Sequence, residues 1–183
     1  TTSDQVTDSM SAMGVGIDDL QGYLDVIVTT NNKANTTAAD LMDAFIGCGG
    51  AARAAGMNYK ETSTALGILA NNGIKGSEAG TALNSMLVRI STKDVAQKAF
   101  KDLGVAVYDS SGEMRNMRDI LVDLNGAMAG MTQEQKNSYM SAIAGTNYYS
   151  QFGYLLDGVK EGVNGSASAW DELAGAIDNS TGA

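Results

Sequence analysis

Residues 66–91 read Leu-Gly-Ile-Leu-Ala-Asn-Asn-Gly-Ile-Lys-Gly-Ser-Glu-Ala-Gly-Thr-Ala-Leu-Asn-Ser-Met-Leu-Val-Arg-Ile-Ser, and this stretch decides the fold class. On both sides of its centre, apolar residues recur at the spacing of a helix that buries one face. Glycine between them can take the left-handed conformation that ends a helix, and the next apolar residue then closes a Schellman end. The expected N-cap of the second helix is Ser77, with Glu78 near its positive end. The stretch predicts a helical hairpin whose turn and flanks are specified by Asn72, Gly73, Ile74, Gly76, Ser77, Glu78, Ala79 and Leu83.

The composition also favours helices. The 183 residues include no proline, although an average content of about 5% would supply about nine. The 22 glycines are more than helices favour, and many fall at predicted helix ends. Others fall inside predicted helices, where we expect them to allow close approach between helices; these are Gly22, Gly67, Gly80, Gly126 and Gly153.

Further helices are expected along most of the chain. Thr37 begins one, Asn58 with Glu61 begins another in the manner of a capping box, and Thr132 with Gln135 forms a further box. The turn that starts at Gly56 resembles the one that starts at Gly73, which suggests that successive helices stack. The expected helical ranges are 18–28, 37–55, 59–72, 77–91, 93–103, 117–131, 132–144, 148–163 and 166–178.

One short β segment interrupts this pattern. Gly104 ends a helix, and the four residues 105–108 read as a strand. Residues 109–112, which end in Gly112, have turn chemistry, and a return strand through Met114 would complete a small β-hairpin near 105–115. The predicted fold is therefore mainly α, a compact multi-helix domain of stacked helical hairpins with one small β-hairpin. We divide it into a frayed or weakly helical lead-in (1–16), a helical core domain (17–163) and a terminal helix or connector (164–183).

The residues offer little for catalysis. The chain has no histidine, which removes the usual general base and the usual zinc ligand. It contains no phosphate-binding loop, nucleophile elbow or Cys-x-x-Cys motif. Its single cysteine, Cys48, is expected to be a small packing residue. Carboxylates could in principle act as a pair on a sugar, but most fall at expected caps or turns; the candidates are Glu61, Glu78, Glu113 and Glu134. We expect no catalytic residue, cofactor or metal.

Charge and hydropathy limit the partners. The formal net charge is −9, and an acidic chain repels phosphate, so we expect no nucleic-acid binding through this segment. There is no signal peptide and no run of 18 apolar residues, so we expect no membrane contact through it either.

Several blocks of this sequence resemble one known family. Residues 69–83 followed by 86–91 are similar to the core signature of phage tail tape measure proteins. Similar blocks follow in the family's order, and the resemblance covers roughly residues 36–160; these blocks are residues 99–109, 112–115, 119–121, 131–135 and 143–145. The chain departs from the family pattern at Asn116-Met117, where a proline is expected.

The resemblance implies a structural role. Family members lie along the tail axis of long-tailed phages, template assembly of the tail tube and set tail length. Expected partners are tail tube, tail tip or tail-assembly chaperone proteins, with possible self-association. The expected locations are the virion tail and, during assembly, the bacterial host cytoplasm. Since the chain begins with Thr-Thr-Ser, we interpret it as a fragment of a longer protein. Two alternatives stay open: a cell-wall-degrading module of a tape measure protein, and a generic helical adaptor.

Overall fold

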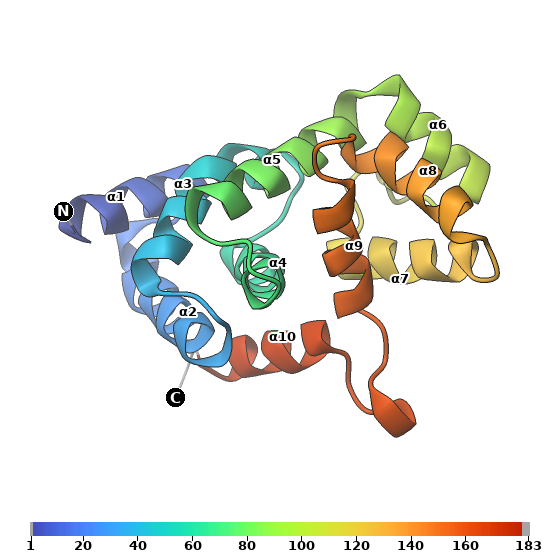
Figure 1. The fold of residues 1–183 in the computed structure, drawn as a ribbon. Coiled ribbons are helices and arrows are strands. Elements are labelled where there is room, and N and C mark those ends of the chain that lie inside the picture. The colour runs from blue at the N-terminus through green and yellow to red at the C-terminus, as the bar shows by residue number, and fades with distance from the viewer. Residues whose placement is uncertain (1, 181–183) are drawn as a thin grey trace.

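The structure is a computed structural model that describes residues 2–180, and it is mainly helical, as the sequence predicts (Figure 1). Figure 1 shows α1 to α4 and α10 at one end and α6 to α9 at the other, with α5 running from one group to the other. The helices are α1 (Thr2–Met13), α2 (Leu20–Lys33), α3 (Ala38–Ala54), α4 (Tyr59–Asn71), α5 (Gly76–Thr92), α6 (Asp94–Leu103), α7 (Met117–Met128), α8 (Gln133–Ala144), α9 (Tyr149–Gly158) and α10 (Ala169–Ser180). Short 3₁₀ turns, η1 (Ile17–Asp19) and η2 (Val163–Gly165), precede α2 and α10.

Helix α4 is the centre of the larger group. Every residue from Thr62 to Ala70 is buried, so the helix has no solvent-facing side over most of its length. Helices α2, α3, α5, α9 and α10 all contact it. A helix without an exposed stripe is typical of the middle of a core, and Figure 1 shows α4 nearly end-on inside a ring of other helices.

The buried hydroxyl groups of α4 all have a hydrogen-bond partner, which allows their burial. The Thr62 hydroxyl donates to the carbonyl of Asn58 at 2.8 Å, and the Thr64 hydroxyl donates to the carbonyl of Lys60 at 2.9 Å. The Ser63 hydroxyl lies 2.7 Å from that of Thr30 on α2. A hydroxyl that finds an acceptor within its own helix avoids most of the cost of desolvation.

Helices α3 and α5 meet along a seam of small residues. A Cβ atom added to Gly80 would lie 2.5 Å from the carbonyl oxygen of Ala44 and 3.0 Å from its Cα. Gly47 faces the same point, because its added Cβ would lie 3.4 Å from the Cα of Gly80. The two backbones therefore approach more closely than any residue with a side chain would permit. Of the glycines predicted to allow such approach, Gly126 does not: nothing lies within 4 Å of its added Cβ.

Both ends of the described chain pack on the other helices. Residues 2–13, expected as a frayed or weakly helical lead-in, form α1, which contacts α3 and buries Met10 and Met13. At the other end, α10 contacts α2 and α4 and buries Trp170. The expected helix over 148–163 is shorter, since α9 ends at Gly158. The domain limits at residues 17 and 163 stay predictions.

The predicted β-hairpin near 105–115 is wrong. Between α6 and α7 the structure contains one isolated antiparallel bridge, Tyr108 to Met114, and no strand among the residues it describes. The Asp109 carboxylate accepts hydrogen bonds from the backbone N–H of Ser111 at 2.9 Å and of Glu113 at 3.0 Å. These bonds organise the loop as an Asx turn. Val105 donates its N–H to the carbonyl of Phe100 and so completes the end of α6, and the pairing does not extend beyond this one bridge.

Candidate functional site

The turn between α4 and α5 has the Schellman geometry. Gly73 has a φ of +86°, in the left-handed region. The N–H of Ile74 donates to the carbonyl of Leu69 at 3.0 Å, and the N–H of Gly73 donates to that of Ala70 at 3.0 Å. These two bonds satisfy carbonyls that the end of a helix leaves free. The Asn72 side chain adds a bond of 2.9 Å to the carbonyl of Ile68.

The start of α5 differs from the prediction. The N-cap is Lys75, no side chain makes a capping bond there, and Ser77 lies inside the helix. Gly76 has a φ of +60°, so a second left-handed glycine redirects the chain into α5. The expected Ser77 cap is therefore wrong, and backbone conformation sets the start of the helix. Glu78 lies in the first turn of α5, where its charge favours the helix dipole.

The other members of this motif are core residues. Ala79 and Leu83 are buried on the face of α5 that includes Gly80. Only Asn72, Gly73, Ser77 and Glu78 among the predicted site residues at this turn are exposed. The motif therefore connects two packed helices, and at its exposed side Asn72 borders a cleft of about 210 Å³.

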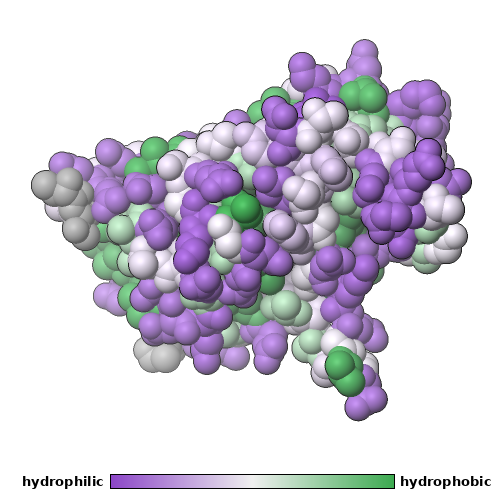
Figure 2. All heavy atoms as spheres, viewed as in Figure 1, coloured by the Kyte–Doolittle hydropathy of each residue, from purple (hydrophilic) through white to green (hydrophobic). Residues whose placement is uncertain are grey.

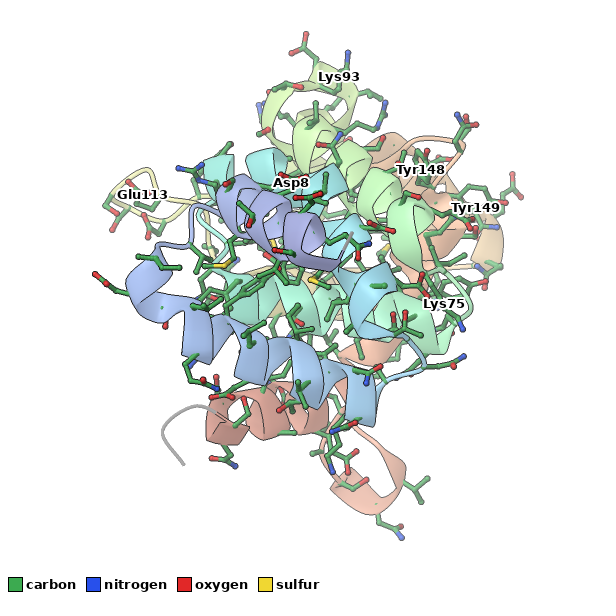
Figure 3. All side chains as sticks on the ribbon, turned by 90° about the vertical axis from the view of Figure 1, so that its left-hand side faces the viewer. Asp8, Lys75, Lys93, Glu113, Tyr148 and Tyr149 are labelled. Atoms are coloured by element: carbon green, nitrogen blue, oxygen red, sulfur yellow. The ribbon has the colours of Figure 1, made fainter. Side chains whose placement is uncertain are left out.

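Gly104 and Gly112 lie elsewhere. Gly104 ends α6 with a φ of +70°, and Gly112 lies in the loop after the isolated bridge with a φ of +84°. Figure 3 shows Glu113, the neighbour of Gly112, at the opposite margin of the molecule from Lys75. The structure therefore does not bring the predicted site residues together, and their role in function stays a prediction.

One bonding pattern recurs at four helix ends. In each, an apolar residue that follows a glycine donates its N–H to a carbonyl five residues earlier, as a Schellman end requires. The sequence predicts a likeness between only two of these turns, those that start at Gly56 and Gly73. The four bonds are Val15 to Met10, Met57 to Ala52, Ile74 to Leu69 and Val105 to Phe100.

A glycine-to-alanine change tests the turn. Gly73→Ala should lower the free energy of unfolding by about 1–2 kcal/mol, because a Cβ disfavours the left-handed conformation. Gly175→Ala in α10 is the matched control, with nothing within 4 Å of the added Cβ, and it should raise stability by about 0.5–1 kcal/mol. Urea unfolding measures both. An equal response at the two sites would contradict the turn assignment.

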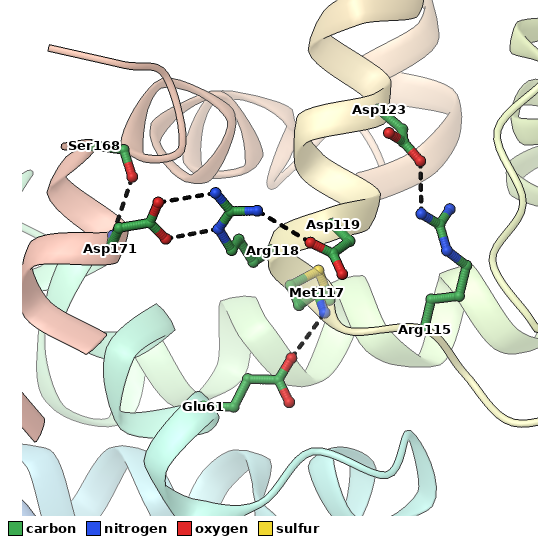
Figure 4. Close-up of polar contacts among 8 residues, drawn as sticks. All are labelled: Glu61, Arg115, Met117, Arg118, Asp119, Asp123, Ser168 and Asp171. Atoms are coloured by element: carbon green, nitrogen blue, oxygen red, sulfur yellow. Dashed lines mark hydrogen bonds and ion pairs between the residues drawn. The ribbon is translucent and has the colours of Figure 1, made fainter. Parts of the chain in front are cut away.

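A polar cluster that the sequence did not predict joins α4, α7 and α10 (Figure 4). The Arg118 guanidinium donates to both carboxylate oxygens of Asp171, at 2.6 and 2.9 Å, and to Asp119 at 3.1 Å. The Glu61 carboxylate accepts the backbone N–H of Met117 at 2.8 Å. Partners more than 50 residues apart share no local pattern, so no sequence signal could have revealed these pairs.

The electrostatics of this cluster follow from burial and pairing. Burial raises the pKa of Glu61, the Met117 N–H partly offsets this, and the charge of Asp119 adds to it. The hydrogen bonds from Arg118 lower the pKa of Asp171, and the same bonds raise the pKa of the Arg118 guanidinium. An arginine bidentate to a carboxylate fixes geometry as well as charge, so this pair fastens α10 to α7.

The cluster borders a cleft of about 260 Å³ that also includes Trp170 and Asn58. A carboxyl with a raised pKa in a cleft is a candidate general acid. Here, however, Glu61 already binds the first N–H of α7, where a carboxylate stabilises a helix start. The Trp170 side chain is buried and cannot stack on a ligand. The geometry serves to hold helices together.

Other chemistry is scarce in residues 2–180. No group of three or more histidine, cysteine, aspartate or glutamate side chains in this part of the chain could hold a metal ion. Burial raises the pKa of the Cys48 thiol to about 12, so this cysteine stays protonated and packs as a small residue. Among the described helices, none has the length and apolar character needed to cross a bilayer.

The pH dependence of stability tests the role of Glu61. Its pKa is raised in the folded chain, so its contribution is fully present below its ordinary pKa of 4.5 and is lost as pH rises through the folded value. Glu61→Gln keeps an oxygen for the Met117 N–H but does not titrate. We therefore expect wild type to lose stability relative to this variant as pH rises from acidic to neutral.

Urea unfolding at a series of pH values measures this difference. Glu134→Gln is the matched control, because Glu134 is an exposed first-turn glutamate on α8. The control should follow the wild-type pH profile. Parallel profiles for wild type and Glu61→Gln would contradict the buried position of this carboxylate.

The fold and the polar cluster define a class of protein, a helical domain in which other helices surround the buried helix α4. Schellman turns end several of these helices, and the polar cluster links α4, α7 and α10. The sequence model of the phage-related minor tail protein family matches residues 1–145, which include α1 to α8. The chain therefore belongs to the phage-related minor tail protein family.

Two curated relatives narrow this identification. The chain is 32% identical over all 183 residues to the tape measure protein of Pneumococcus phage Dp-1, of which it covers 15%. Over 155 residues, 83% of this chain, it is 29% identical to the probable tape measure protein of Escherichia phage P2, of which it covers 19%. The chain thus spans less than a fifth of the length of either relative. No solved structure matches it. The resemblance to tape measure proteins that the sequence indicates is confirmed.

Proposed function

We propose that this chain is a non-enzymatic structural segment of a tape measure protein, part of a molecule that templates tail-tube assembly and sets tail length. The observation that supports this most strongly is the similarity of the whole chain to the tape measure protein of phage Dp-1. On this proposal the segment lies in the virion tail and, during assembly, in the host cytoplasm. Its partners would be tail tube, tail tip or tail-assembly chaperone proteins, with self-association as a further possibility.

The fold suggests how this segment differs from the rest of such a molecule. A helix adds about 1.5 Å of length per residue, so a long uninterrupted helix converts chain length into distance. The longest helices described here, α3 and α5, have 17 residues each and fold back beside one another. The segment therefore contributes a compact body, with its exposed surface available for partners, and adds little to axial length.

Electron microscopy of phage tails tests this proposal. In-frame deletions elsewhere in the parent protein should shorten the tail in proportion to the residues removed, by about 1.5 Å each. A change that unfolds the present segment should reduce the number of tails while leaving the length of the completed ones unchanged. A tail length that stays constant when residues are deleted from the parent protein would refute the tape measure role. Tails shortened by unfolding this segment alone would refute its role as a compact body.

The non-enzymatic part of the proposal has its own test. A peptidoglycan clearing assay with the purified chain should show no activity, because Glu61 is committed to the start of α7. Clearing by wild type that disappears in Glu61→Gln would instead establish a cell-wall-degrading module. Figure 2 shows a mostly hydrophilic face with scattered hydrophobic residues, which is compatible with a structural role.

A further inference from the structure

The loop between α9 and α10 projects from the body of the protein (Figures 1 and 2). Every residue from 160 to 167 is exposed, and Val163 at its tip is 83% exposed. Asn164 has φ and ψ of 58° and 31°, and Gly165 has a φ of +75°. The N–H of Ser166 donates to the carbonyl of Val163 at 3.2 Å. Two successive left-handed residues closed in this way form a type I′ turn, which favours the pair Asn-Gly.

This loop is bonded only to itself. The N–H of Gly162 donates to the carbonyl of Ser166 at 2.9 Å, and the N–H of Gly165 donates to that of Gly162 at 3.2 Å. No described hydrogen bond joins residues 161–167 to the rest of the protein. Opening the turn therefore breaks only local hydrogen bonds among those described, and such segments open at a low free-energy cost.

An Asn-Gly pair is chemically vulnerable when its backbone can move. The backbone nitrogen of the glycine attacks the side-chain Cγ of the asparagine, a new N–C bond forms, and ammonia leaves. Water then opens the resulting succinimide ring at either carbonyl and gives aspartate or isoaspartate. Glycine favours the reaction because it has no side chain to hinder attack. The reaction needs water and no other reactant.

The chain contains three Asn-Gly pairs, and the structure protects two of them. At Asn72, the side-chain amide donates to the carbonyl of Ile68, and the attacking N–H of Gly73 donates to that of Ala70. Attack there would break both of these hydrogen bonds at the end of α4. Asn125 lies within α7, and its side-chain amide donates to the carbonyl of Leu156 at 2.8 Å. Attack at this site would require α7 to unwind.

We propose that Asn164 is a modification site, at which spontaneous deamidation introduces a carboxylate into the loop that leads to α10. Its side chain makes no described hydrogen bond, and its glycine neighbour makes only a long one. The product adds one negative charge to a chain whose net charge is already −9. The isoaspartate product also lengthens the backbone by one carbon and cannot keep the type I′ turn. The connection between α9 and α10 thereby changes with the age of the protein.

Peptide-mapping mass spectrometry of the full chain, aged at mildly alkaline pH, tests this proposal. Asn164 should deamidate at least about tenfold faster than Asn72 or Asn125, since each 1.4 kcal/mol of opening free energy slows reaction about tenfold. The same chain aged in urea should react at the three sites at comparable rates, because only folding distinguishes them. Asn164→Gln should remove the dominant product, while the control Asn72→Gln should leave it.

Two results would overturn the assignment. One is an Asn164 that stays intact in the folded chain while it reacts in urea. The other is a folded chain in which Asn72 or Asn125 reacts as fast as Asn164. Either would mean that the loop is more firmly held than its local hydrogen bonds imply.

Discussion

Replacing Phe45 with alanine should lower the free energy of unfolding by about 3–5 kcal/mol, the cost of truncating a fully buried aromatic side chain. Phe45 on α3 is 0% exposed. Its ring centroid lies 5.9 Å from that of Tyr23 on α2, in a tilted arrangement. Because the surroundings of a buried site relax only partially when a side chain is truncated, a cavity should remain. Urea unfolding followed by circular dichroism measures the loss.

The neighbouring residue supplies the control. Ile46 is 43% exposed, so Ile46→Ala should change stability by less than about 1 kcal/mol. The two substitutions differ by one position on the same helix. Comparable losses at both would show that α3 is rotated from the orientation described. If Phe45→Ala unfolds the chain entirely, the smaller change Phe45→Leu keeps the comparison measurable.

Enlarging Gly80 should cost about 3 kcal/mol or more, at the upper end of the range for overpacked cores. Its added Cβ would lie 2.5 Å from the backbone oxygen of Ala44, and a backbone atom cannot yield as a flexible side chain can. Gly80→Leu should therefore force α3 and α5 apart, and Gly80→Ala should have a smaller effect of the same sign. Thermal unfolding of the series measures the trend.

Replacing a glycine of α7 with alanine should raise stability, the opposite of the effect expected at Gly80. Nothing lies within 4 Å of the Cβ added to Gly126, so Gly126→Ala should raise stability by about 0.5–1 kcal/mol through helix propensity. A gain in stability at Gly80 would mean that the seam between α3 and α5 is not closely packed. The pair of sites thus separates helix propensity from helix contact.

The helices themselves could be predicted because their signals are local. Thr132 and Gln135 form the expected capping box, and Thr37 and Asn58 accept the expected bonds from the helices that they begin. Each of these depends on residues within one turn of the chain. The β-hairpin could not be judged this way, because strand pairing joins residues on opposite sides of a turn, and in the structure this pairing is limited to the bridge between Tyr108 and Met114.

Orientation around a helix was less predictable. Ile46, Val28 and Val95 are apolar residues within helices, but all three are exposed. Apolar periodicity defines a stripe about a third of a turn wide, and residues at its edge can point either way. The position of the neighbouring helix determines whether such a residue is buried or exposed. That position cannot be read from the local sequence pattern.

The predicted site residues also differ according to whether their structure depends on local sequence or on contacts with distant residues. Gly73 takes the left-handed conformation that was predicted for the end of α4. Ser77, in contrast, does not cap α5, because the left-handed Gly76 redirects the backbone before it. The ion pair between Arg118 and Asp171 was not predictable from the sequence, because the two residues lie far apart along the chain. A bond between residues 53 positions apart exists only once the chain has folded.

The sequence by itself determined the helical class, most helix ends and the family, because capping, periodicity and motif order are properties of neighbouring residues. Only the tertiary structure decided that α4 would be the buried centre, that Gly80 would meet the backbone of Ala44, and that Glu61 and Arg118 would link three helices. These features depend on which surfaces are desolvated together. Desolvation acts on residues that are neighbours in space, wherever they lie along the chain.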